Sequence, residues 1–184
     1  MGILHKHLVA ETTMQQHKET QEKSLFFQIG TEKLIELSLA SFGLYGLYWN
    51  YQNWLQIERQ NGNVNPLLRT VLSLFFQYDL FRRVYQQSEQ DGEKPRWSPA
   101  RVYLLYVLFN LIPVWLLLTD HPWGGLVFML TLLPNLLVNQ TINLIHDKRL
   151  RFFAQNTDLS GTDWGVITVG FVVWLSMMVM AVMA

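Results

Sequence analysis

Amide side chains recur at helical spacing in one apolar stretch, and they are the best placed for chemistry. Asn135, Asn139 and Asn143 are spaced four residues apart, and His146 follows three residues later. At about 100° per helical residue these positions fall within about 80° of one another, with Gln140 beside them. The stripe could line a polar groove for a solute, an ion or a lipid headgroup. It could also bond neighbouring helices, at about 0.6 kcal/mol for each hydrogen bond on average. We favour the second interpretation and keep the first open.

Two prolines bear on this asparagine stripe. Pro134 directly precedes it, and a proline inside a helix leaves a backbone carbonyl without its usual partner. Asn110 lies close to Pro113 in the preceding apolar stretch. We therefore expect the stripe to point inward, toward the span that contains Asn110, or into a contact between subunits.

Glu36 and Asp79 are the carboxylates that fall within long apolar stretches. Carboxylates at membrane depth are functional candidates because they are costly there. Both lie toward the cytoplasmic ends of their expected helices, near Lys33 and the pair Arg82-Arg83. We expect a structural ion pair, with Glu36 close to Arg82 or Arg83.

Other catalytic chemistry has little support. The chain has no cysteine, which removes disulfides, thiol catalysis and Cys-based metal sites. It has no phosphate-binding glycine loop and no metalloprotease or hydrolase motif. His5 and His7 could supply half of a metal site, but no other ligand lies near them in the sequence. The formal net charge is zero, so no bulk field favours nucleic acid. We expect no metal, no cofactor, no nucleic-acid partner and no enzymatic activity.

The distribution of charge predicts membrane-spanning helices. Charged residues crowd into residues 1–33, 82–101 and 147–163. About 20 apolar helical residues cross a bilayer. The charge-poor segments between and after these regions predict transmembrane helices at about 102–118, 123–145 and 164–184. Pro113 and Pro134 should kink the first two.

Residues 31–87 predict a helical hairpin embedded in the membrane. Gly43 and Gly46 interrupt an apolar run, and a dense aromatic cluster follows. Aromatic side chains of this kind prefer the headgroup level. Asn61-Gly62-Asn63 is a turn signature, and Asn65-Pro66 should begin the next helix. The hairpin either crosses or re-enters on one side. The interfacial aromatics would be Tyr45, Tyr48, Trp49, Tyr51 and Trp54.

Lysine and arginine predict the orientation. Residues 82–101 and 146–163 carry many of them, whereas 119–122 carries none. We therefore expect the first two segments in the cytoplasm, 119–122 outside and the C-terminus in the periplasm. Residues 1–30 are expected to form a polar cytoplasmic tail. Residues 31–184 would form a single helical membrane domain.

The stretch from Leu37 to Trp54 resembles a group of small uncharacterised bacterial inner-membrane proteins. Its apolar run ends in Phe42-Gly43-Leu44-Tyr45, followed by the pair Tyr48-Trp49. The resemblance continues through Asn65-Pro66, Arg69 and Leu80-Phe81-Arg82-Arg83, and recurs weakly at Gln140, Asn143 and the final apolar span. It implies a polytopic helical architecture and a bacterial source.

Together these features predict an all-α polytopic membrane protein with an N-terminal hairpin and three transmembrane helices. Its expected role is non-enzymatic, as an accessory, scaffold or assembly subunit that contacts membrane lipids and either itself or a larger complex. The alternative is a small binding or transport protein for a solute, an ion or a lipid, using the asparagine stripe. A membrane enzyme is a third possibility.

Overall fold

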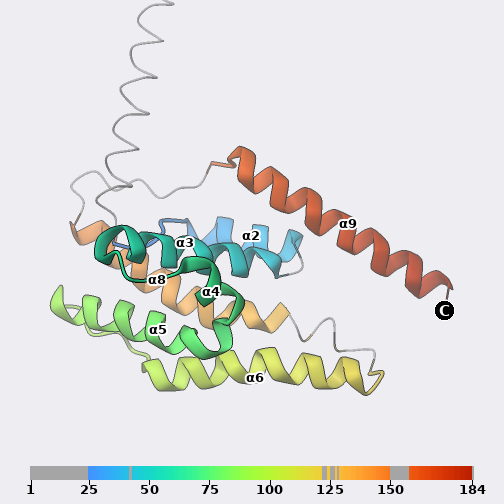
Figure 1. The fold of residues 1–184 in the computed structure, drawn as a ribbon, viewed down its shortest axis with the longest axis horizontal. Helices are drawn as coiled ribbons and strands as arrows, with labels where there is room; N and C mark the ends of the chain where they lie inside the picture. Colours follow the sequence, from blue (N-terminus) through green and yellow to red (C-terminus); the bar gives the residue numbers. More distant parts are fainter. Residues whose placement is uncertain are drawn as a thin grey trace, which may run out of the picture.

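The computed structural model describes residues 25–41, 43–121, 124, 127, 129–149 and 158–183, and it is built from helices (Figure 1). The all-α fold class predicted from the sequence is confirmed. The helices are α2 (Thr31–Ala40), α3 (Leu44–Asn61), α4 (Pro66–Val71), α5 (Ser73–Gln90), α6 (Pro99–Leu118), α8 (Leu132–Arg149) and α9 (Gly161–Met183), with a 3-10 turn, η1 (Met129–Thr131), before α8.

Short turns make the chain run back and forth between two ends of the molecule. Gly43 adopts a left-handed conformation with φ of 83° and separates α2 from α3. Gly62 does the same with φ of 67° after α3, where the sequence predicts a turn. Glycine is favoured there because it has no Cβ to clash with the backbone. The predicted break at Gly43 is confirmed, whereas Gly46 continues within α3.

Helix starts follow their local signals. The Asn65 side chain accepts a hydrogen bond from the Leu68 amide, and Pro66 is the first residue of α4. The Ser98 side chain caps α6 in the same way, with Pro99 first. The long helix expected after Asn65 is interrupted at Leu72, which separates α4 from α5.

The predicted spans need correction at their ends. Helix α8 begins at Leu132, not at residue 123, so Pro134 lies in its first turn instead of kinking a longer helix. A proline fits there because the first N–H groups of a helix have no intrahelical acceptor. Within the described residues, α6 is the one helix both long and apolar enough to cross a membrane, and the apolar stretch Gly161–Ser176 of α9 is shorter.

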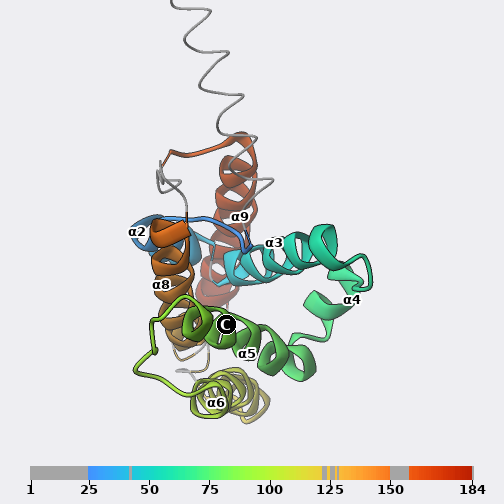
Figure 2. The same cartoon turned by 90° about the vertical axis from the view of Figure 1, so that its left-hand side faces the viewer.

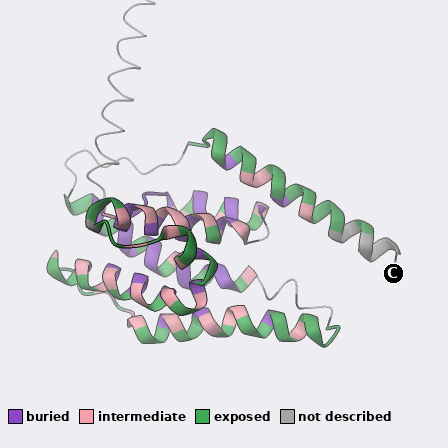
Figure 3. Cartoon of the chain, in the orientation of Figure 1, coloured by how far each residue is buried: buried purple, intermediate pink, exposed green. Residues whose placement is uncertain are grey.

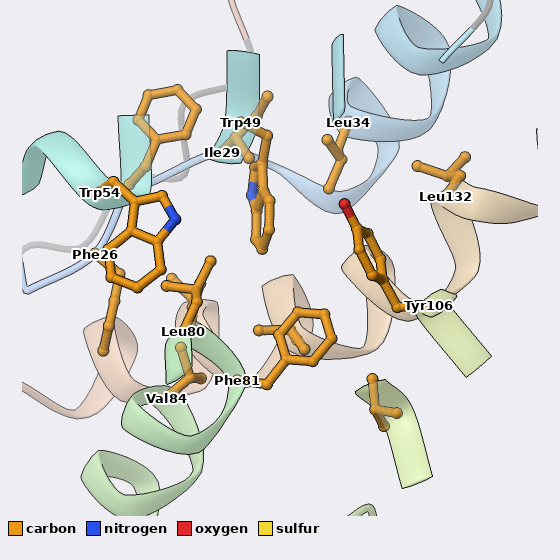
Figure 4. Packing of buried hydrophobic residues seen from close by; sticks show 14 of the residues in the cluster. Phe26, Ile29, Leu34, Trp49, Trp54, Leu80, Phe81, Val84, Tyr106 and Leu132 are labelled. Carbon is orange, nitrogen blue, oxygen red and sulfur yellow. The ribbon is translucent and has the colours of Figure 1, made fainter. Parts of the chain in front are cut away.

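The buried core lies between α2, α3, α5 and α8 (Figure 3). Figure 4 shows Trp49 beside Ile29, with Leu80 and Phe81 of α5 facing them. Phe26, Phe27 and Ile29 are buried as well. The end of the predicted polar tail, residues 25–30, is therefore an extended segment inside the core. Residues 1–24 lie outside the described part.

The predicted interfacial position of the aromatic cluster is wrong for three of its members. Tyr45, Trp49 and Trp54 are fully buried, while Tyr48 and Tyr51 are half-buried. The Gly43 break directs α3 back along the body, where it contacts α2, α4 and α5. Aromatic side chains on α3 therefore pack inside the domain.

Candidate functional site

Four residues of the asparagine stripe lie on the buried face of α8. Asn139 is 0% exposed, and Asn135, Asn143 and His146 are also buried. Gln140 is exposed. Helical spacing therefore places the amides together in the core, where each needs a hydrogen-bond partner.

Two of these amides hold the extended segment before α2. The side-chain N–H groups of Asn139 and Asn143 each donate to the Ile29 carbonyl, both at 3.0 Å. The Phe27 amide donates to the Asn53 side chain at 3.1 Å. Buried backbone outside a helix has no intrasegment partners, so side chains must satisfy it. The stripe thus fixes the entry of the chain into the core.

Asn139 also joins α8 to α3. Its side-chain oxygen accepts a hydrogen bond from the Trp49 indole N–H at 3.0 Å. Asn135 accepts a bond from the Gln77 amide of α5 at 3.4 Å. A Cβ at Gly46 would lie 3.5 Å from the Asn135 amide nitrogen. The stripe is therefore a junction between α8 and the helices around it.

Asn110 does not join this junction. Its amide donates to the Tyr106 carbonyl within α6, at 2.7 Å. Two other α6 residues reach α5 with their hydroxyls: Tyr106 donates to Ser73 at 3.0 Å, and Tyr103 donates to the Leu74 carbonyl at 2.7 Å. The predicted contact between Asn110 and the stripe is wrong, because the amide returns to the preceding turn of its own helix.

The predicted ion pair involves Asp79 and not Glu36. Asp79 lies 2.6 Å from Arg69 and 3.2 Å from Arg83, measured between nitrogen and carboxylate oxygen. The Arg69 guanidinium also lies over the Trp54 ring, 4.4 Å from its centroid. Glu36 and Arg82 are both exposed on different helices. Arg69 lies on α4 and Asp79 on α5, and spacing alone could not show that the break at Leu72 brings the two together.

Sequence reasoning missed a buried ion pair between α2 and α9. The Lys33 ammonium lies 2.8 Å from an Asp163 carboxylate oxygen, and both side chains are almost fully buried. The Tyr45 hydroxyl and the Ser160 side chain also donate to Asp163. Both charges border apolar stretches in the sequence, which was the available signal.

A second set of charges holds the loop before α6 against the end of α8. Arg149 donates to the Asp91 carboxylate at 2.7 Å, and Lys148 donates to Glu93 at 2.5 Å. The hydrogen bond from Arg149 holds the pKa of Asp91 below its usual value. These pairs are more exposed than the one between Lys33 and Asp163, so each contributes little stability by itself.

In the part of the chain that the structure describes, no three His, Asp or Glu side chains lie close enough together to bind a metal ion. His5 and His7 lie outside the described residues.

No protein-family model, curated protein or solved structure matches this chain.

Proposed function

We propose that this chain is a polytopic helical protein of a bacterial inner membrane and acts as a non-enzymatic accessory, scaffold or assembly subunit of a membrane complex. The observation that carries the proposal is the distribution of polarity. Asparagine and glutamine side chains are gathered in the core, whereas large apolar side chains cover the outside of α6 and α9. Many large apolar side chains exposed along the same helices are typical of surfaces that contact lipid or another protein.

Helix α9 offers the surface on which a partner protein would bind. It packs against α2 and α3 but leaves side chains on several of its faces exposed (Figures 1 and 3). Phe171 is 61% exposed, and Val172 and Leu175 are exposed as well. Membrane helices associate through close packing and polar contacts, so an outlying helix is a natural attachment surface.

Tagged full-length protein purified in mild detergent tests this proposal. We expect a different membrane protein to co-purify in a fixed ratio. Combined Phe171→Ala, Val172→Ala and Leu175→Ala substitutions should lower the amount of that protein at least several-fold. The variant should resist alkaline extraction from membranes as the wild type does. Three alanines replacing Leu104, Leu108 and Leu111 of α6 provide the matched control.

The alternative, a binding or transport protein for a solute, an ion or a lipid, predicts another result. The chain would purify alone or as a homo-oligomer with a bound molecule, and Asn139→Leu would release that molecule. The stripe geometry favours the accessory role, since Asn139 already bonds to Ile29 and Trp49. A membrane enzyme has no positioned reactive group to support it among the described residues.

A further inference from the structure

A groove lies on the outer side of the asparagine stripe, between the start of α2 and the end of α8. It has a volume of about 400 Å³ and is lined by Thr31, Gln140, Asn143, Leu144 and Asp147. Four of these five side chains carry an oxygen, and none is a lysine or arginine. The groove therefore offers hydrogen-bond acceptors and one negative charge.

Asn143 supplies an unused acceptor in this lining. The residue is 5% exposed, and its amide nitrogen donates to the Ile29 carbonyl. Its Oδ1 atom has no hydrogen-bond partner among the described residues. A buried amide oxygen without a donor is costly, so a ligand that donates hydrogen bonds would relieve it.

Asp147 supplies the charge. It is exposed in the last turn of α8, where the helix dipole disfavours a negative side chain. The neighbouring cations, Lys148 and Arg149, are paired with Glu93 and Asp91. None of the salt bridges formed by the described residues uses Asp147. Because Asp147 is exposed, an external cation can reach its carboxylate.

The outward face of α8 also shows what the rest of the ligand would contact. Leu133, Leu137 and Leu144 are exposed at helical spacing, and Asp147 follows one turn beyond Leu144. An apolar face that ends in acceptors and a carboxylate fits an acyl chain whose headgroup carries hydrogen-bond donors and a positive charge.

We propose that this groove binds the primary ammonium group of an aminophospholipid, such as phosphatidylethanolamine. The ammonium donates to the Asp147 carboxylate and to the amide oxygens of Gln140 and Asn143, and the acyl chains lie along Leu137 and Leu144. This inference rests on the proposed membrane insertion. Phosphatidylcholine has the same charge but no N–H groups, so it cannot make these bonds.

Native mass spectrometry of the purified full-length protein tests the site. The probes are dioleoyl phosphatidylethanolamine and dioleoyl phosphatidylcholine at equal concentration. We expect roughly tenfold preferential retention of phosphatidylethanolamine, as for a charge-assisted hydrogen bond. Asp147→Asn should remove the preference, whereas Glu89→Gln, an exposed acid on α5 outside the groove, should keep it. Removing a negative charge from a helix C-terminus does not threaten folding, and thermal unfolding verifies this.

Equal retention of the two lipids by the wild type would overturn the proposal, as would an unchanged preference in folded Asp147→Asn. Displacement of the lipid by an equal concentration of free ethanolamine would overturn the lipid as the source of the amine. Resistance to that competition supports it. A protein that resists alkaline extraction yet does not distinguish the lipids would refute this inference alone and leave the proposed membrane role standing.

Discussion

At the residue scale, Asn139 uses both the oxygen and the N–H group of its side-chain amide. Its oxygen accepts from the Trp49 indole while its nitrogen donates to the Ile29 carbonyl. An aspartate could only accept and a leucine could do neither. Both partners are fully buried, so water cannot replace the lost bonds. The residue therefore acts as a connector between an extended segment and two helices.

Asn139→Leu should lower the free energy of unfolding by about 1–3 kcal/mol, because the Trp49 N–H loses its acceptor and stays buried. Gln140→Leu, at the next position but exposed, should change it by less than about 0.5 kcal/mol. Denaturation of the detergent-solubilised protein, followed by tryptophan fluorescence, measures both. Trp49→Phe in the Asn139→Leu background should recover part of the loss. Equal effects of the two leucine substitutions would contradict the structural role assigned to the stripe.

The buried Lys33–Asp163 ion pair attaches α9 to the rest of the molecule. Each charge is buried, and burial is tolerated because the partner and the Ser160 and Tyr45 donors surround the carboxylate. The pair links α2 to the first turn of α9. It therefore ties α9 to the body at one end and leaves the far end of the helix to be held by packing.

At the element scale, that packing depends on Gly170. A Cβ built there would lie 2.4 Å from the Ser41 Cα atom and 2.6 Å from the Ala40 carbonyl oxygen. Backbone cannot yield as a flexible side chain does. The absence of a side chain is what allows α9 to approach the end of α2, in the manner of small residues at membrane helix contacts.

Gly170→Ala should therefore loosen α9, while Gly165→Ala should not. Around Gly165 a new Cβ would meet nothing within 4 Å, so alanine there should be neutral or stabilise the helix by up to about 1 kcal/mol. Hydrogen exchange of the α9 amides in detergent micelles reports the difference. We expect faster exchange in Gly170→Ala only. Similar exchange in the two variants would show that α9 does not dock through this contact.

Local sequence signals predicted where helices begin and end better than they predicted which segments pack together. Gly62, Asn65-Pro66 and Ser98-Pro99 each act within a few residues, and each ends or begins a helix as expected. The burial of residues 26–29 depends on Asn139 and Asn143, more than 100 residues away. Helical spacing correctly placed the asparagine stripe on one face of α8. It could not show that Ile29 and Trp49 are the partners of the stripe, or that Asn110 is not. Aromatic composition likewise could not distinguish an interface from a core.

At the scale of the whole molecule, the helices connect two ends of different character. The loop between α5 and α6 and the end of α8 lie at one end, with the Asp91–Arg149 and Glu93–Lys148 pairs (Figures 1 and 2). The turn after α6 and the end of α9 lie at the other (Figure 1). If the chain is inserted in a bacterial inner membrane as proposed, the basic residues predict that the charged end faces the cytoplasm and the C-terminus faces the periplasm.

Within the proposed membrane insertion, this arrangement predicts that the hairpin over residues 31–87 re-enters on the cytoplasmic side. The C-terminal end of α3, which Gly62 follows, lies at the charged end of the molecule, and the N-terminal end of α3 lies toward the other end (Figure 1). The exposed sites Asn63 and Gln90 should therefore be on the cytoplasmic side, and Thr119 on the periplasmic side. Because the chain has no cysteine, the single substitutions Asn63→Cys, Gln90→Cys and Thr119→Cys each introduce one thiol whose labelling reports the side of the membrane.

An impermeant thiol reagent should label Thr119→Cys in intact cells, and the other two variants only after permeabilisation. Labelling of Asn63→Cys from outside would place the Gly62 turn in the periplasm and contradict the fold's orientation, because Asn63 and Gln90 would then lie on opposite sides. Labelling of all three from one side would refute the spanning of α6.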